Sequence, residues 1–136
     1  MQSALSHIQF NIDPSNIGFY KELLDFLGWK VIFEMEGMAG LQGKGDASVW
    51  FMPQAASAAN DYDGPGMNHL GIGVESQSDV DEAARYLTGK GVEALFETPR
   101  HRPEFAMEEG RTYYQVMFKS PDNILFEVVY TGLKAD

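Results

Sequence analysis

Residues 118–127 read Phe-Lys-Ser-Pro-Asp-Asn-Ile-Leu-Phe-Glu. The Ser-Pro-Asp-Asn segment at 120–123 consists of turn-forming residues, so the stretch predicts two strands, 112–118 and 124–131, joined by a tight turn. Glu127 lies within the second strand, which is otherwise apolar. Burying an ionised carboxylate without a partner is costly, so Glu127 either faces solvent at a sheet edge or has a cationic partner such as a divalent metal ion.

Two earlier strands each carry a histidine. Residues 5–12 and 67–75 alternate between apolar and polar positions, which is typical of half-buried strands. His7 and His69 lie on the faces opposite the apolar side chains. Around His69 this face also carries two glycines, and glycine inside a strand often marks the close approach of a ligand.

The two histidine strands indicate a diverged internal repeat of strand, helix and three strands. Three features recur in nearly the same register: a strand histidine (His7 and His69), a glycine that ends a helix (Gly28 and Gly91) and a Phe-Glu pair (Phe33-Glu34 and Phe96-Glu97). The separation of the two histidines differs by one position from that of the other two pairs, and one inserted residue near the end of the helix accounts for this difference. The histidines therefore occupy equivalent places in two related modules.

The predicted modules span 1–53 and 67–136 and together form one domain. Between them, 54–66 is rich in Ala, Ser, Asn, Asp, Gly and Pro and reads as a linker. The second module is expected to contain a helix that begins at Ser78-Asp79. It should also contain a strand over 92–97 and a polar loop over 98–110 that is long enough to act as a lid.

The composition of the chain limits the kinds of metal ligand and of binding partner that the protein can have. The chain has 136 residues, of which 44% are hydrophobic, so it can form a packed core. It has no cysteine, which excludes disulfides and thiolate ligands, so a metal must bind through nitrogen and oxygen. The net charge of -10 argues against a nucleic-acid partner. We find neither a signal-peptide pattern nor an apolar run of the roughly 20 residues that span a bilayer, and expect a cytoplasmic protein without a membrane partner.

Two imidazoles and one carboxylate suit Fe(II), Mn, Zn, Ni or Co and leave positions open for substrate or water. The two histidine strands, the repeated halves and the Phe-x-x-Pro-Asp-x-x-x-x-Glu segment at 118–127 resemble the vicinal oxygen chelate superfamily. That superfamily includes glyoxalase I, extradiol dioxygenases, methylmalonyl-CoA epimerase and the bleomycin and fosfomycin resistance proteins. The resemblance implies an α+β fold in which two βαβββ modules form a curled mixed sheet around a metal-binding cleft. The metal ligands that it implies are His7, His69 and Glu127.

Departures from the family pattern limit the choice of reaction. Ser120 and Asn123 replace the usual Asp and Gly of the turn, and Asn tolerates the left-handed conformation needed there. Trp50 occupies the place where glyoxalase I-like enzymes carry a fourth, acidic ligand. Met117 stands where extradiol dioxygenases carry a tyrosine. The phosphonate of fosfomycin requires a cationic cluster, for which only four basic residues lie nearby: Arg100, Arg102, Arg111 and Lys119.

The same strand alternation predicts a small-molecule pocket with aromatic, apolar and polar walls, made by Gln9, Trp50, Met52, Tyr113, Gln115 and Met117. His101 is the candidate catalytic proton carrier, with a solvated loop histidine as the alternative. We expect either a metal-dependent lyase, isomerase or dioxygenase acting on a small oxygen-chelating substrate, or a drug-sequestering protein of the bleomycin-resistance type in which the metal is absent or incidental. A homodimer is also expected, with the modules paired within one chain or swapped between two.

Overall fold

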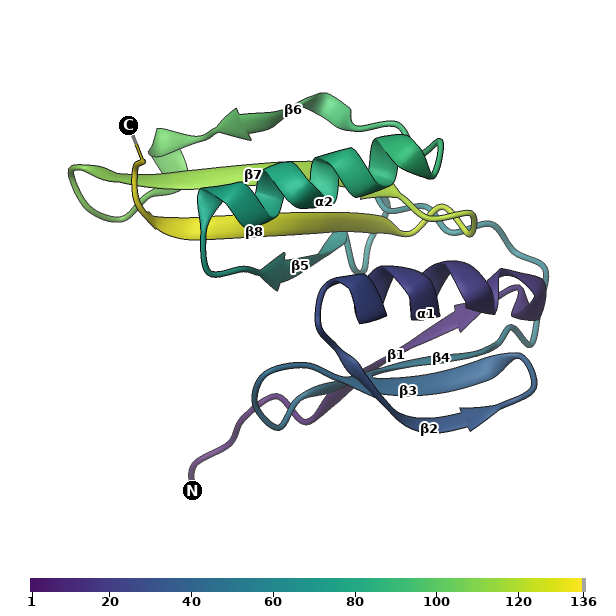
Figure 1. The fold of residues 1–136 in the computed structure, drawn as a ribbon. Helices are drawn as coiled ribbons and strands as arrows, with labels where there is room; N and C mark the ends of the chain where they lie inside the picture. The colour runs from purple at the N-terminus through teal and green to yellow at the C-terminus, as the bar shows by residue number, and fades with distance from the viewer. Residues whose placement is uncertain (136) are drawn as a thin grey trace. The chain divides into compact units, whose positions relative to one another are not determined.

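The computed structural model describes residues 1–135 and divides into two compact units, Met1–Ala59 and Asn60–Asp136. The boundary between the units falls inside the segment 54–66. Each unit contains one four-stranded mixed sheet and one α-helix (Figure 1). The predicted α+β class with two βαβββ modules is therefore confirmed, and each module forms a sheet of its own. No helix in the described part of the chain is long and apolar enough to cross a membrane.

The first unit begins with a strand and a short 3-10 turn, followed by a helix and three strands. These are β1 (His7–Ile12), η1 (Pro14–Asn16), α1 (Ile17–Phe26), β2 (Lys30–Met35), β3 (Met38–Gln42) and β4 (Ser48–Pro53). The strand order is β1-β4-β3-β2, with β1 and β4 parallel and the other neighbours antiparallel. α1 packs on β2 and β3. Tyr20 of α1 stacks on Phe51 of β4, with ring centroids 4.3 Å apart.

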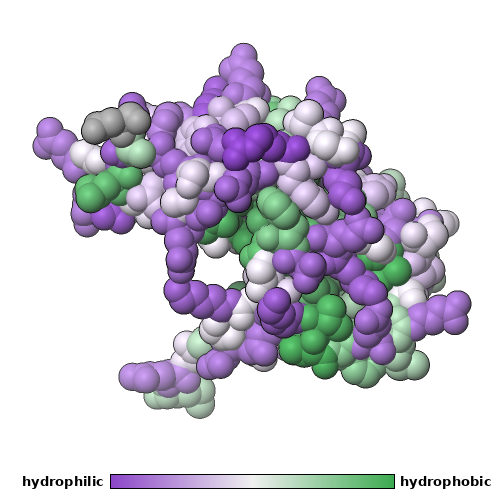
Figure 2. Space-filling model, viewed as in Figure 1, coloured by the Kyte–Doolittle hydropathy of each residue, from purple (hydrophilic) through white to green (hydrophobic). Residues whose placement is uncertain are grey.

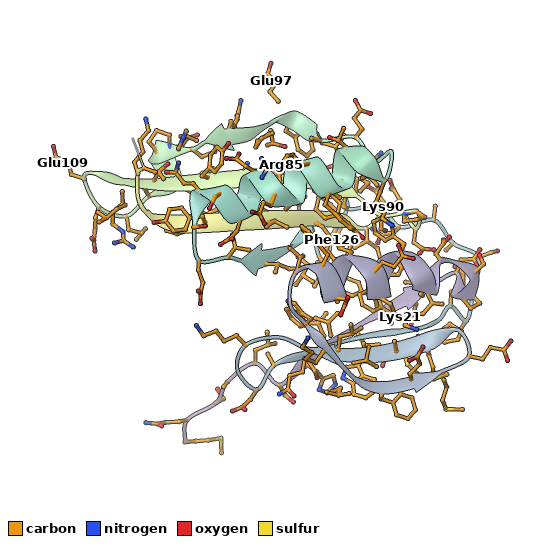
Figure 3. The ribbon with its side chains drawn as sticks, viewed as in Figure 1. Lys21, Arg85, Lys90, Glu97, Glu109 and Phe126 are labelled. Atoms are coloured by element: carbon orange, nitrogen blue, oxygen red, sulfur yellow. The ribbon has the colours of Figure 1, made fainter. Side chains whose placement is uncertain are left out.

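The second unit repeats this order. Its elements are β5 (His69–Gly73), α2 (Gln77–Gly89), β6 (Leu95–His101), η2 (Pro103–Phe105), β7 (Arg111–Lys119) and β8 (Leu125–Leu133). The strand order is β5-β8-β7-β6, with β5 and β8 parallel. α2 packs across β6, β7 and β8, and in Figure 1 it lies along the sheet. Phe126, labelled in Figure 3, is fully buried and stacks with Phe118 at 5.7 Å.

The start of α2 differs slightly from the prediction. The helix is capped by Ser76, whose side chain accepts a hydrogen bond from the Asp79 amide, while the Asp79 carboxylate accepts one from the Ser76 amide. This reciprocal capping satisfies two amides that the helix cannot bond itself. Gly28 and Gly91 follow the equivalent helices with φ of 85° and 72°, as the repeat predicts. A positive φ favours glycine and ends each helix.

The predicted loop at 98–110 is largely structured. β6 runs through His101, and η2 follows it, so the polar composition here does not mark an unstructured lid. Phe96 and Glu97 have φ of 56° and 59°, and the pairing with β7 shifts between Leu95 and Arg100. The Thr98 hydroxyl bridges this irregularity by donating to the Leu95 carbonyl at 2.6 Å and accepting from the Met117 amide at 2.9 Å. In Figure 3, Glu97 points away from the sheet.

The molecular surface is mostly hydrophilic on the side shown in Figure 2, with scattered apolar patches. β2, at the edge of the first sheet, is exposed along its whole length. Its charged residues include Glu34, which pairs with Lys21 of α1. In both units, one sheet face packs against the helix, and the opposite face carries the repeated histidine, His7 in the first unit and His69 in the second.

Candidate functional site

Glu127 is the buried carboxylate of the second unit, with only 3% of its surface exposed. It lies on β8 directly opposite Gly71 of the parallel strand β5. A Cβ atom added at Gly71 would come within 3.1 Å of the Glu127 Oε2 atom. The missing side chain at position 71 thus gives the carboxylate room beside β5, where its Oε2 atom lies 3.4 Å from the Nε2 atom of His69.

Asn68 determines which nitrogen of His69 faces the carboxylate. The Asn68 amide nitrogen donates to the Tyr62 carbonyl at 2.9 Å, so its oxygen is the atom that approaches His69. That oxygen lies 2.8 Å from Nδ1 of His69 and must accept a hydrogen bond from it. A neutral His69 therefore carries its proton on Nδ1, and its Nε2 lone pair faces Glu127.

Tyr113 holds the carboxylate from the other side. Its hydroxyl lies 2.9 Å from both oxygens of Glu127 and donates to them. Burial, reinforced by this hydrogen bond and by the negative charge of Glu127, raises the pKa of Tyr113 to about 12. Tyr113 is consequently a protonated donor at neutral pH, and its hydroxyl holds the carboxylate of Glu127 in place.

This donor pair meets the requirements of a metal ligand pair. Two ligand atoms each about 2.1 Å from a tetrahedral metal ion lie about 3.4 Å apart, which matches the Nε2 to Oε2 distance. The lone pair of Nε2 and the carboxylate oxygen repel each other unless a proton or a cation lies between them. Asn68 and Tyr113 supply the outer hydrogen bonds that usually orient such ligands. Within the described residues, neither unit by itself gathers three or more His, Asp or Glu side chains into a metal site.

A cavity of about 230 Å³ opens beside this pair in the second unit. It brings together five residues predicted from the sequence, namely His69, Glu127, Tyr113, Gln115 and Met117. Its remaining walls come from residues that the sequence reading did not place there: Tyr62, Asp63, Asn68, Phe96, Arg102, Phe105 and Leu125. The walls thus combine apolar surface with a few polar groups, as small-molecule sites do.

The predicted residues of the first unit lie on the equivalent sheet. Gln9 pairs with Trp50 across β1 and β4 in the way that Gly71 pairs with Glu127, so Trp50 occupies the place of the carboxylate. Gly40 leaves room for the Trp50 ring, because an added Cβ would lie 2.7 Å from it. Met52 is half-buried two residues further along β4.

His7 is exposed on β1, and its Nδ1 atom lies 3.2 Å from the Ser6 hydroxyl. The residue before each repeated histidine therefore contacts its Nδ1 atom, Ser6 in the first unit and Asn68 in the second. This polar residue directly before the histidine is the sequence signal by which Asn68 could have been found.

His101 lies away from the cavity. It belongs to β6, where it pairs with Tyr114 of β7, and its ring packs on Tyr114 at 4.5 Å. Its Nδ1 atom contacts the Thr112 hydroxyl at 2.7 Å, and the Tyr114 hydroxyl donates to Asp81 of α2. Since Tyr114 faces the helix, His101 is on the opposite sheet face from Glu127. Burial is the main cause that lowers the pKa of His101 below its usual value.

Comparison with known proteins agrees with this architecture. Residues 8–128 match the family model of the Glyoxalase/Bleomycin resistance protein/Dioxygenase superfamily. A proposed glyoxalase from Bacillus halodurans superposes with a TM-score of 0.78 at 25% identity, covering 95% of this chain and 96% of that one. The fosfomycin resistance protein FosX from Listeria monocytogenes, crystallised with Mn(II) and sulfate, superposes with a TM-score of 0.69 at 22% identity, covering 98% and 94%.

A curated relative, YqjT of Bacillus subtilis, is described as uncharacterized. It is 39% identical over 64 residues, which span 47% of this chain and 46% of that protein, so the match covers about half of each. The family model, in contrast, covers both units from β1 to β8. The chain therefore belongs to the glyoxalase, bleomycin resistance protein and dioxygenase superfamily, also called the vicinal oxygen chelate superfamily.

Proposed function

We propose that this protein is a divalent-metal-dependent enzyme that acts on a small oxygen-chelating substrate. The observation that carries the proposal is the pair formed by His69 Nε2 and Glu127 Oε2, 3.4 Å apart. The Asn68 hydrogen bond leaves the Nε2 lone pair directed at this carboxylate. The third ligand that we propose is His7, which lies on the equivalent strand of the first unit.

A bound metal ion would act as a Lewis acid that polarises the oxygens of the substrate. The protein residues around the ligands have separate tasks. Tyr113 fixes the position of the Glu127 carboxylate by donating to both of its oxygens. Asn68 holds the imidazole of His69 in one orientation and one tautomer. The apolar side chains of Phe105, Met117 and Leu125 limit the access of water to the cavity.

The donor set narrows the choice of metal and reaction only partly. Imidazole and carboxylate suit Fe(II), Mn, Zn, Ni and Co. FosX from Listeria monocytogenes was crystallised with Mn(II), which supports manganese as the first ion to test. Trp50 in place of an acidic residue favours a three-ligand site over the four-ligand site of glyoxalase I. Iron would indicate oxygen chemistry, whereas the other ions would indicate lyase, isomerase or transferase chemistry.

A second candidate function is the sequestration of a small molecule without a metal. The apolar walls of the cavity favour it, because they could hold a ligand without any chemical reaction. In that case a proton between His69 and Glu127 would take the place of the metal, and the pair would be an ion pair. A cytoplasmic location and a homodimer stay predictions under both functions.

Metal analysis of protein purified without chelator tests the proposal. We expect one divalent ion per chain, lost in His7→Ala and His69→Ala. His101→Ala is the matched control, since the third histidine of the chain contacts Thr112 and Tyr114 instead of Glu127. Equal metal content in all three variants, or metal-free wild-type protein that does not take up Mn²⁺ or Zn²⁺, would leave sequestration as the better function.

A further inference from the structure

Gln115 is a polar residue in the wall of the cavity. It lies on β7, is 3% exposed and lines the cavity beside Glu127. Its side-chain amide has no hydrogen-bond partner among the residues that the structure describes, in contrast to Glu127 and Thr98 nearby. Arg100 Nε is the one fully buried side-chain polar atom without a partner in the described part of the chain, so the Gln115 amide is not sealed in the core and can bond to a group in the cavity. The cavity is the place from which such a partner can reach Gln115.

Arg102 adds a positive charge on the same sheet face. Its amide donates to the Tyr113 carbonyl at 2.7 Å, which places Arg102 next to Tyr113, while Arg100 pairs with Gln115. Arg102 and Gln115 are therefore diagonal neighbours across two antiparallel strands. The Nε atom of Arg102 donates to Glu104, and its guanidinium lies 4.5 Å from the Phe105 ring centroid. Its two terminal nitrogens have no hydrogen-bond partner among the described residues and remain available as donors.

The rest of the cavity is suited to a hydrocarbon group. Phe105 packs edge-on against Tyr113 at 5.6 Å, and Met117 and Leu125 are buried in the wall. A volume of about 230 Å³ corresponds to about eight water-sized groups. This is the size of a small acid with a six-membered ring.

We propose that Gln115 and Arg102 determine specificity by binding the carboxylate of a small, otherwise apolar organic acid. The carboxylate accepts hydrogen bonds from the Gln115 amide and from the terminal nitrogens of Arg102, while the hydrocarbon part lies against Phe105, Met117 and Leu125. This inference deepens the proposed function, because it assigns the class of substrate to the same cavity.

A structural role for Gln115 is the competing explanation. The Nε atom of Arg100 is buried and has no partner in the part of the chain that the structure describes, and Arg100 lies directly across the strand pair from Gln115. A rotation of the Gln115 side chain could satisfy this atom. In that case replacing Gln115 would lower thermal stability and leave ligand binding unchanged.

Titration of the ¹⁵N-labelled full chain with benzoate, followed by NMR, distinguishes these roles. We expect the side-chain amide signal of Gln115 to shift on addition of benzoate, in protein as purified and after treatment with chelator. Gln115→Met, which keeps the length of the side chain, should weaken benzoate binding more than tenfold, because it removes a hydrogen bond to a charged group. Gln54→Met makes the same change at an exposed position and should bind benzoate like the wild type.

Benzamide, which lacks the charge that Arg102 would recognise, should bind more weakly than benzoate. Equal or tighter binding of benzamide, an unshifted Gln115 signal, unchanged affinity in Gln115→Met, or no binding of benzoate by the wild type would each overturn the inference. Uptake of Mn²⁺ by Gln115→Met separates the two proposals. If the protein binds metal but does not bind benzoate, the specificity role alone is refuted. If the protein binds benzoate through Gln115 but does not bind metal, the metal function alone is refuted.

Discussion

Gly71 and Gly73 lie two residues apart on the same face of β5, and alanine at the two positions should have different effects on metal binding. A Cβ atom at position 71 would lie 3.1 Å from the Glu127 Oε2 atom, whereas a Cβ atom at position 73 would meet nothing within 4 Å. Ordinary van der Waals contact begins near 3.4 Å, so Gly71→Ala should push the carboxylate back by about 0.3 Å.

This displacement is larger than the roughly 0.2 Å within which metal–ligand distances normally vary. We therefore expect Gly71→Ala to weaken Mn²⁺ or Zn²⁺ binding about tenfold, which corresponds to about 1.4 kcal/mol. Gly73→Ala should leave the affinity unchanged. Because alanine is better than glycine inside a strand, Gly73→Ala should also raise the free energy of unfolding by about 0.5 kcal/mol.

Isothermal titration of the metal-free proteins with Mn²⁺ and Zn²⁺ measures the affinities, and urea denaturation measures the stabilities. A wild-type metal affinity in Gly71→Ala would refute the assignment of Glu127 Oε2 as a ligand atom. A loss of affinity in Gly73→Ala as large as that in Gly71→Ala would show that the effect comes from the strand and not from the carboxylate.

Three further predictions concern the hydrogen bonds around this site and the helix beside it. Asn68→Ala should lower metal affinity about tenfold and change the ¹⁵N shifts of the His69 ring, since it removes the acceptor that fixes the tautomer; unchanged ring shifts would contradict this. Tyr113 has a raised pKa of about 12, so Tyr113→Phe should remove one late step from the tyrosine absorbance titration at 295 nm. The same raised pKa means that Tyr113 contributes its full stabilisation below pH 10 and loses it as the pH rises toward 12. Ser76→Ala should lower the free energy of unfolding by about 1 kcal/mol and the melting point by a few degrees, because it removes the cap of α2. A smaller loss of stability in Ser76→Ala than in Ser78→Ala would argue against Ser76 as the cap.

Much of the fold could be predicted from the sequence because its signals are local. The alternation around His7 and His69 and the Ser-Pro-Asp-Asn turn each specify a short element. The helix-ending glycines Gly28 and Gly91 do the same. Asn123 has a φ of 58°, as its place in the turn requires. The register was also predictable, since Gln9 pairs with Trp50 as Gly71 pairs with Glu127.

The part that the sequence did not reveal depends on long-range pairing. The polar segment after Glu97 reads as a loop, yet Arg100 and His101 pair with β7 beyond an irregularity that the Thr98 hydroxyl bridges. This pairing turns His101 toward the helix side of the sheet and brings Arg102 to the cavity side. No periodicity in the segment marks the irregularity, so the faces of these residues could not be assigned in advance.

The central claim is that a divalent metal ion lies between His69 and Glu127 with His7 as the third protein ligand. A crystal structure of protein loaded with Mn²⁺ or Zn²⁺, with anomalous diffraction at the metal edge, tests it most directly. We predict one anomalous peak bonded to Nε2 of His69 and a carboxylate oxygen of Glu127, and to the imidazole of His7. No peak at this position, with Nε2 of His69 hydrogen-bonded to Glu127 instead, would contradict the claim.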